Sequence, residues 1–368
     1  MTRAWGSRLV PSSFLLVPFL CVLCASVENS AAADEVFRPR VVIVSQFEPG
    51  ADEGDRPGEF QFWVEREKLS RVIPLPAAFH DVRANADGTI IGIVTGGGTA
   101  RAAATVMALG CDARFDLTKS YWLINGIAGV DPADASLGSA AWAEWVVDGD
   151  LAHEIDPREM PKDWTTGFIP LDQSVPYGKP KKAEGEYFNM VYHLNGALRE
   201  WAFRLTRDTP LDGFSDDKVK KLRERYVDYP NARKSAFVLK GDEISASTFW
   251  HGAVLDRWAN DWVSYWTDGK ANYVMTAMED SGSLQSLKFL AKAGRVDWNR
   301  IMVLRTASNY DSPPPGMTAA ESLAAENASS LSAYLPSLEA AYAVGSRVVH
   351  EIVNNWPKYE STPPSDKP

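Results

Sequence analysis

Two polar positions in the last third of the 368-residue chain have the residue types and spacing of a binding cleft. Glu279 follows Met278 at the end of an apolar run, and Asn309 follows Ser308 one predicted helix and one predicted strand later. That spacing can bring a carboxylate and a side-chain amide to one cleft. A carboxylate accepts strong, charge-assisted hydrogen bonds, whereas an amide both donates and accepts but cannot deliver a proton.

Two glycine-rich turns supply backbone groups for such a cleft. Residues 95–99 read Thr-Gly-Gly-Gly-Thr between a predicted strand and a predicted helix. Gly97 and Gly98 therefore present N–H groups at a helix start, which is a cradle for an anion or an oxygen-rich ligand. Asn125 and Gly126 follow the next predicted strand. We predict ligand contacts at both turns; the alternative is that these glycines serve tight turns alone.

Further candidates stand at other strand ends. Glu48 leaves the first buried strand at its carboxyl end, the edge where open α/β sheets place ligands. Phe249 and Trp250 precede a tryptophan-rich predicted helix and are candidates to line a pocket, although core packing is the commoner role of any single Trp. His251 is expected to be a structural histidine bonded to backbone. The other histidines and Cys111 lack metal-ligand spacing, so no metal site is predicted.

Buried strands alternate with helices, which indicates an α/β domain with a largely parallel or mixed sheet. Strands are predicted at residues 41–44, 89–94, 121–124, 140–147, 235–239, 273–278 and 302–306. Helices are predicted at 60–69, 100–109, 187–207 and 212–225, and a final one at 318–354 with Thr318 as its N-cap.

The first 33 residues are typical of a cleaved secretory signal peptide, because two arginines precede an apolar stretch and three small residues, Ala31–Ala33. We expect one domain over residues 34–357 and a disordered tail at 358–368. No later segment reaches the roughly 18 to 20 apolar residues of a membrane span. The formal net charge of −10, without a stripe of Lys and Arg, argues against nucleic acid as a partner.

Taken in order, these blocks resemble the nucleoside phosphorylase and nucleosidase superfamily and, more closely, the purine nucleoside permease family. The resemblance rests on the glycine turns, the Met278–Glu279 and Ser308–Asn309 pairs, and the stretch 241–252. It implies a three-layer α/β/α fold with a central mixed sheet and a purine nucleoside in a cleft. Glu279 would then accept hydrogen bonds from the ribose hydroxyls, Asn309 would meet the base, and Phe249 and Trp250 would stack on it.

Two departures from the superfamily's pattern leave the chemistry open. Where bacterial nucleosidases carry an aspartate that protonates the purine, this chain has Asn309, with Asp311 as the nearest substitute acid. Where phosphorylases place an arginine, this chain has Leu123, which puts a phosphate partner in doubt and favours water as the nucleophile, oriented by Glu48. The alternative is an exported nucleoside-binding component that assists a separate transporter. No cofactor is predicted, and a homo-oligomeric state stays open.

Overall fold

The computed structural model describes residues 36–171, 173–178, 190–328 and 332–365. The predicted signal segment, residues 1–33, lies outside the described residues. Among the helices in the described part of the chain, none combines the length and apolar character that a membrane crossing requires.

The centre of the fold is a mixed sheet, which has 12 strands in the described residues. Its main order is β10-β7-β12-β13-β5-β1-β4-β3-β2. Three further strands extend it: β14 pairs with β5 and β6, and β6 also pairs with β11. β1 is parallel to β4 and β5, whereas β13 runs antiparallel to β5. The strands are β1 Val41–Ser45, β2 Arg71–Ile73, β3 Val82–Ala84, β4 Ile90–Val94, β5 Tyr121–Val130, β6 Ala140–Ala143, β7 Trp145–Asp148, β10 Val191–His193, β11 Val238–Lys240, β12 Asp242–Ser245, β13 Tyr273–Ala277 and β14 Ile301–Tyr310. A small separate ribbon pairs β8 His153–Glu154 with β9 Phe168–Ile169.

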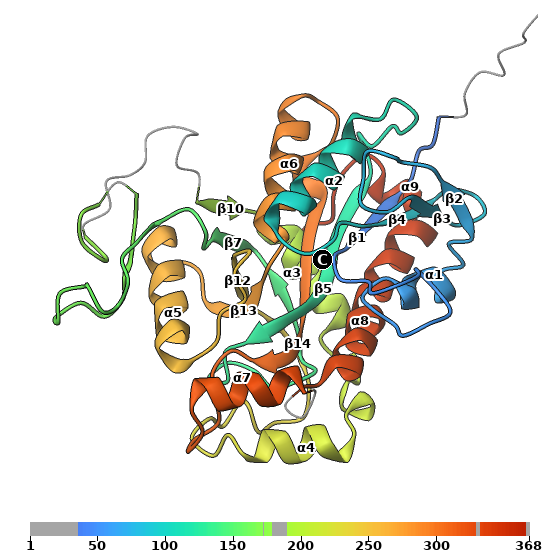
Figure 1. The fold of residues 1–368 in the computed structure, drawn as a ribbon. Helices are drawn as coiled ribbons and strands as arrows, with labels where there is room; N and C mark the ends of the chain where they lie inside the picture. Colours follow the sequence, from blue (N-terminus) through green and yellow to red (C-terminus); the bar gives the residue numbers. More distant parts are fainter. Residues whose placement is uncertain (1–35, 172, 179–189, 329–331, 366–368) are drawn as a thin grey trace, which may run out of the picture. The chain divides into compact units, whose positions relative to one another are not determined.

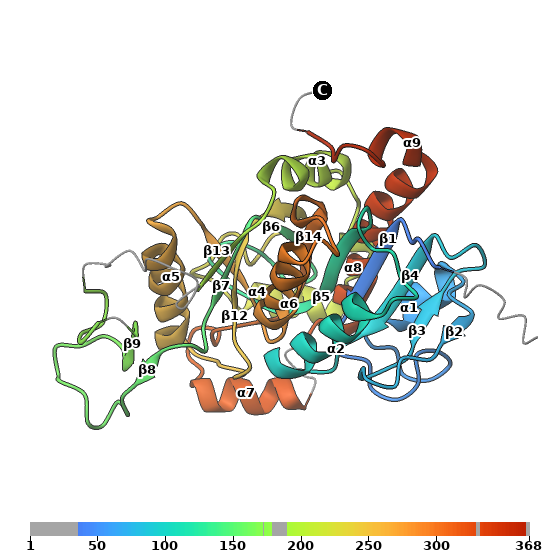
Figure 2. The same ribbon diagram turned by 90° about the horizontal axis from the view of Figure 1, so that it is seen from above.

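Helices cover both faces of this sheet (Figures 1 and 2). They are α1 Gln61–Arg66, α2 Thr99–Cys111, α3 Gly196–Thr206, α4 Asp217–Glu224, α5 Ala253–Thr267, α6 Asp280–Lys292, α7 Ala319–Asn327, α8 Tyr334–Asn354 and α9 Trp356–Tyr359, with 3-10 turns η2 Asp212–Phe214 and η3 Trp298–Arg300. Alternate residues of β1 belong to different cores, because a strand points successive side chains to opposite faces. Val41 and Ile43 pack in the core that contains residues of α1 and α8, whereas Val42 and Val44 pack in the one that contains residues of α2 and α6. The predicted three-layer α/β/α fold is confirmed.

Helices α2 and α6 lie side by side (Figure 1), and glycine makes their close approach possible. A Cβ on Gly282, in the first turn of α6, would collide with the carbonyl oxygen of Thr99 at the start of α2. A Cβ on Gly110, near the other end of α2, would collide with Leu290. This contact places the start of α6 directly beside the triple-glycine turn.

Several elements differ from the sequence-based expectation. The helix predicted at 187–207 contains the strand β10, and the helix α3 begins only at Gly196, with Asn195 as its N-cap. β5 continues to Val130, because β14 pairs with it from Ile301 to Tyr310, so Asn125 and Gly126 lie inside a strand and not in a turn. The strand predicted at 140–147 is two strands that part at Glu144. The final predicted helix is two helices; Thr318 does cap the first of them, in a capping box.

The end of the chain also contributes to the core. Tyr359, in the segment expected to be a disordered tail, is 2% exposed. Its carbonyl oxygen accepts hydrogen bonds from the Tyr121 hydroxyl at 2.9 Å and from Arg300 at 2.9 Å. These bonds join the last helix to the sheet.

Candidate functional site

Arg305 is the centre of the candidate site. It lies in the middle of β14, and its side chain is 1% exposed. The guanidinium group forms a two-point ion pair with the carboxylate of Asp280, with Nε 2.8 Å from Oδ2. It also lies 3.4 Å from Oε2 of Glu279 and 3.8 Å from Oε1 of Glu59. A buried cation is stable only with such partners.

Glu279 occupies the N-cap position of α6 and is 7% exposed. Its Oε1 accepts a hydrogen bond from the backbone N–H of Gly98 at 3.4 Å. A Cβ on Gly97 would lie 3.8 Å from the same oxygen. Burial raises the pKa of Glu279 to about 7, although Arg305 opposes that shift. The structure thus brings Glu279 to the triple-glycine turn and leaves it partly protonated at neutral pH.

Gly126 sits where Glu59 approaches the arginine. A Cβ at this position would collide with Oε1 of Glu59 and crowd Arg305. Glu59 accepts backbone hydrogen bonds from Gln46 at 2.7 Å, Phe47 at 2.9 Å and Ile127 at 2.8 Å. Burial raises the pKa of Glu59, although Arg305 and these N–H groups act in the opposite direction.

Asn125, the neighbour of Gly126, is fully buried, and neither polar atom of its side-chain amide has a hydrogen-bond partner among the described residues. Glu243 is a fourth carboxyl group near the arginine. Burial and the charge of Asp280 raise the pKa of Glu243 well above its usual range.

Ser308 and Asn309 lie further along β14. Asn309 is 5% exposed and pairs with Gly129 of β5 across a bulge in the ladder. Its Oδ1 accepts a hydrogen bond from the Ser308 hydroxyl at 2.8 Å. A Cβ on Gly129 would meet Nδ2 of Asn309 at 3.4 Å and Thr276 of β13 still closer. The amide therefore lies where β5, β13 and β14 meet.

Two of the predicted catalytic residues make contacts away from Arg305. The carboxylate of Glu48 accepts the backbone N–H groups of Gly58, Phe60 and Gln61 at 2.7 to 2.8 Å, so it holds the start of α1. Asp311 is 1% exposed and accepts a 2.5 Å hydrogen bond from the hydroxyl of Tyr273. Burial and the nearby carboxylates of Asp256 in α5 and Asp131, just after β5, raise the pKa of Asp311 well above its usual range.

The two aromatic candidates differ in how much of each side chain is exposed. Trp250 is 8% exposed and packs edge-on against Trp258 in a hydrophobic core. Phe249 is 48% exposed and is free to contact a ligand. Leu123 is fully buried in the core, whereas Arg101 donates a 2.9 Å hydrogen bond to the carbonyl oxygen of Gly97 on the glycine turn.

Five residues of this region were not among the predicted site residues: Glu59, Glu243, Ser247, Asp280 and Arg305. The sequence contained a signal that could have identified Arg305, because a charged residue between Leu304 and Thr306 in a buried strand must find a partner. Ser247 had none. Its hydroxyl accepts the backbone N–H of Thr99 at 3.0 Å, and only the fold brings them together.

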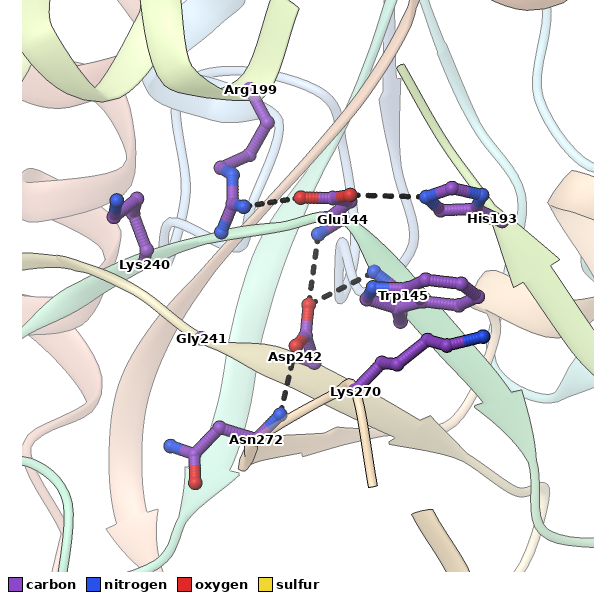
Figure 3. A pocket seen from close by; sticks show the side chains of 9 residues that line it. All are labelled: Glu144, Trp145, His193, Arg199, Lys240, Gly241, Asp242, Lys270 and Asn272. Atoms are coloured by element: carbon purple, nitrogen blue, oxygen red, sulfur yellow. Dashed lines mark hydrogen bonds and ion pairs between the residues drawn. The ribbon is translucent and has the colours of Figure 1, made fainter. Parts of the chain in front are cut away.

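A separate cavity of about 440 Å³ opens at the start of β12 (Figure 3). Its carboxylates are already bonded within the protein. Glu144 contacts Arg199 and His193, and Asp242 accepts three backbone N–H groups. The other end of β12 lies beside α6 of the candidate site, where Ser245 contacts Ser281. The cavity contains none of the predicted site residues and is not the site described above.

Fold and site together define an α/β protein with buried carboxylates, a buried arginine and a glycine turn around one region of β5. The profile of the family described as Purine nucleoside permease (NUP) matches residues 38–364, and the chain belongs to this family. A purine nucleoside permease of Candida albicans (strain SC5314 / ATCC MYA-2876) is 32% identical over 330 residues, which are 89% of this chain and 78% of that protein. A probable purine nucleoside permease of Schizosaccharomyces pombe is 28% identical over 332 residues, 87% of this chain and 91% of that protein.

Similar solved structures include the futalosine hydrolase of Helicobacter pylori, with 16% identity and a TM-score of 0.49, covering 85% of this chain and 98% of that one. The 5'-methylthioadenosine/S-adenosylhomocysteine nucleosidase of Helicobacter pylori has 14% identity and the same TM-score of 0.49, covering 86% and 99%.

Replacing Arg305 tests whether this residue stabilises the buried carboxylates around it. We expect Arg305→Met to lower the free energy of unfolding by about 3 to 5 kcal/mol at pH 8, because Asp280 and its neighbours stay buried without a counter-charge. At pH 5.5 the loss should be smaller, since the unpaired carboxylates can take up protons. Arg66→Met, which removes a half-exposed pair with Glu339, is the matched control and should cost about 1 kcal/mol or less. Equal losses for both variants in urea unfolding would contradict this assignment.

Proposed function

We propose that the protein binds purine nucleosides and hydrolyses their N-glycosidic bond. The observation that carries the proposal is the position of Glu279. One oxygen of its carboxylate faces the N–H of Gly98, and the other faces the buried guanidinium of Arg305. A carboxylate fixed in this way is a charged acceptor for a sugar diol. Its hydrogen bonds can strengthen as the ribose gains positive charge in the transition state.

The remaining roles follow from what lies around that carboxylate. Glu59 lies 3.8 Å from Arg305, and burial raises its pKa, which makes this carboxylate a stronger base for taking a proton from water. The oxygen of that water forms a bond to C1′ of the ribose while the C1′–N9 bond breaks, and the electron pair leaves with the base. The amide of Asn309 can donate a hydrogen bond to the departing base, which takes its proton from solvent.

Binding without cleavage is the second candidate, and one observation favours it. The residue expected to meet the base is an amide, and the nearest carboxyl group, Asp311, is closed in by Tyr273. A site with no exposed acid still recognises a nucleoside but stabilises the leaving base less well. The protein would then deliver intact nucleosides to a separate transporter.

Incubation with inosine or adenosine separates these functions. We expect free base to appear without phosphate, and Glu279→Gln to lower kcat/KM about a hundredfold or more, since it removes a charge that acts in the transition state. Glu224→Gln, an exposed glutamate of α4, is the control and should keep wild-type activity. Free base that forms only with phosphate would replace hydrolysis by phosphorolysis. Calorimetric binding without any free base would leave only the binding function.

The affinity of the site should depend on pH through Glu279. Its pKa is raised to about 7, so the group is protonated below that pH and accepts hydrogen bonds less strongly. We expect calorimetry with purine riboside to show tighter binding at pH 8 than at pH 6. Glu279→Gln should bind more weakly and show a smaller rise. An affinity of the wild-type protein that does not change over this range would argue against ribose binding by Glu279.

We also propose that the chain is exported and processed after Ala33, on the strength of residues 1–33 alone. Expression of the full chain in a secreting host should yield a protein that begins at Asp34. Intact mass of the product measures this directly. A product that retains the first 33 residues inside the cell would refute export.

A further inference from the structure

His251 is a buried histidine whose ring nitrogens are not satisfied by hydrogen bonds from the described residues. Its side chain is 3% exposed, and neither ring nitrogen has a hydrogen-bond partner among the described residues. The sequence had indicated a structural histidine bonded to backbone, and no such bond is present. Buried polar groups in native proteins are nearly always paired, and an unpaired one destabilises the fold. The position therefore needs a further polar group.

Glu326 of α7 is the group that faces this imidazole. Its Oε2 lies 4.0 Å from Nδ1 of His251, too far for a hydrogen bond, and its side chain is 14% exposed. Two polar side chains thus face one another without bonding directly. A ligand that bonds to both side chains would satisfy them.

The loop that carries His251 spans the candidate site. At one end, Ser247 binds the backbone N–H and the hydroxyl of Thr99, beside the triple-glycine turn. At the other end, the N–H of Gly252 donates a 2.7 Å hydrogen bond to the carbonyl oxygen of Asp311, just beyond the end of β14. The loop therefore runs from the turn that contacts Glu279 to the strand end that carries Asn309, and His251 lies toward the second of these.

Helix α7 lies against the same part of the loop. A Cβ on Gly252 would be 3.3 Å from Cβ of Ala319 in the first turn of α7. The helix follows β14 directly in the chain and lies near the end of that strand (Figure 1). His251 and Glu326 thus approach from two elements that border the Asn309 end of the site, where the proposed function puts the base.

The chemistry of the pair matches one class of base. Burial lowers the pKa of His251, so its imidazole is neutral near pH 7 and offers one donor and one acceptor. Burial raises the pKa of Glu326 to about 7, so the group is an anionic acceptor at pH 8. A 6-oxopurine presents an N1–H donor beside an O6 acceptor. A carboxylate and an imidazole N–H are the complement of that edge.

We propose that His251 and Glu326 are specificity-determining residues that bind the N1 and O6 edge of a 6-oxopurine base, as in inosine. This inference rests on the proposed nucleoside-binding function and extends it to the choice of base. Glu326 accepts the N1–H, and His251 donates to O6. Purine riboside, which lacks both groups, leaves the pair unsatisfied.

The test is the ratio of affinities for inosine and purine riboside, measured by calorimetry at pH 8. We expect the wild-type protein to prefer inosine tenfold or more, and Glu326→Gln and His251→Phe to reduce that preference to about threefold or less. Glu321→Gln makes the same chemical change at an exposed position of α7 and should keep the wild-type ratio. Melting temperatures report whether each variant is folded.

The ratio separates recognition from a structural role. If His251 and Glu326 only hold α7 against the loop, their variants weaken the binding of both nucleosides equally. The ratio of affinities then stays unchanged, which overturns the inference. A wild-type protein that binds both nucleosides equally well overturns it too, while the proposed function stands. If neither nucleoside binds, the proposed function itself fails, and the inference fails with it.

Discussion

The site is organised by the pairing of one buried guanidinium group with the carboxylates around it. Arg305 cannot stay charged in the middle of β14 unless carboxylates surround it, and these come from two other parts of the chain. Asp280 and Glu279 belong to the start of α6, and Glu59 precedes α1. The requirement to neutralise this charge therefore fixes the position of α6 and of the segment before α1 relative to β14.

Close backbone contacts make this arrangement possible. Gly126 leaves room for Glu59 and Arg305 beside β5, and Gly282 lets α6 reach the start of α2. A side chain at either position would push apart groups that the ion pairs hold together. The glycine turn before α2 then lies within reach of Glu279. Packing and charge pairing thus act on the same few elements.

The end of the site nearest Asn309 is organised differently. Here the polar groups are an amide, a buried imidazole whose pKa is lowered by burial, and carboxyl groups whose pKa values are raised by burial. A region built around a buried ion pair, beside a region without a buried arginine, fits a ligand that has a polyhydroxyl part and an aromatic heterocycle. This division supports both the proposed nucleoside site and the assignment of its two ends.

Most of the order of strands and helices and the two glycine-rich segments could be read from the sequence, because they depend on local periodicity and on short motifs. The purine nucleoside permease family was likewise recognised from ordered blocks and is confirmed. Only the tertiary structure showed that Asn125 and Gly126 lie within a strand, that Trp250 is buried and that Glu59 lies beside Arg305. These facts depend on contacts between segments far apart in the chain. Burial and charge pairing are properties of those contacts, and local sequence does not contain them.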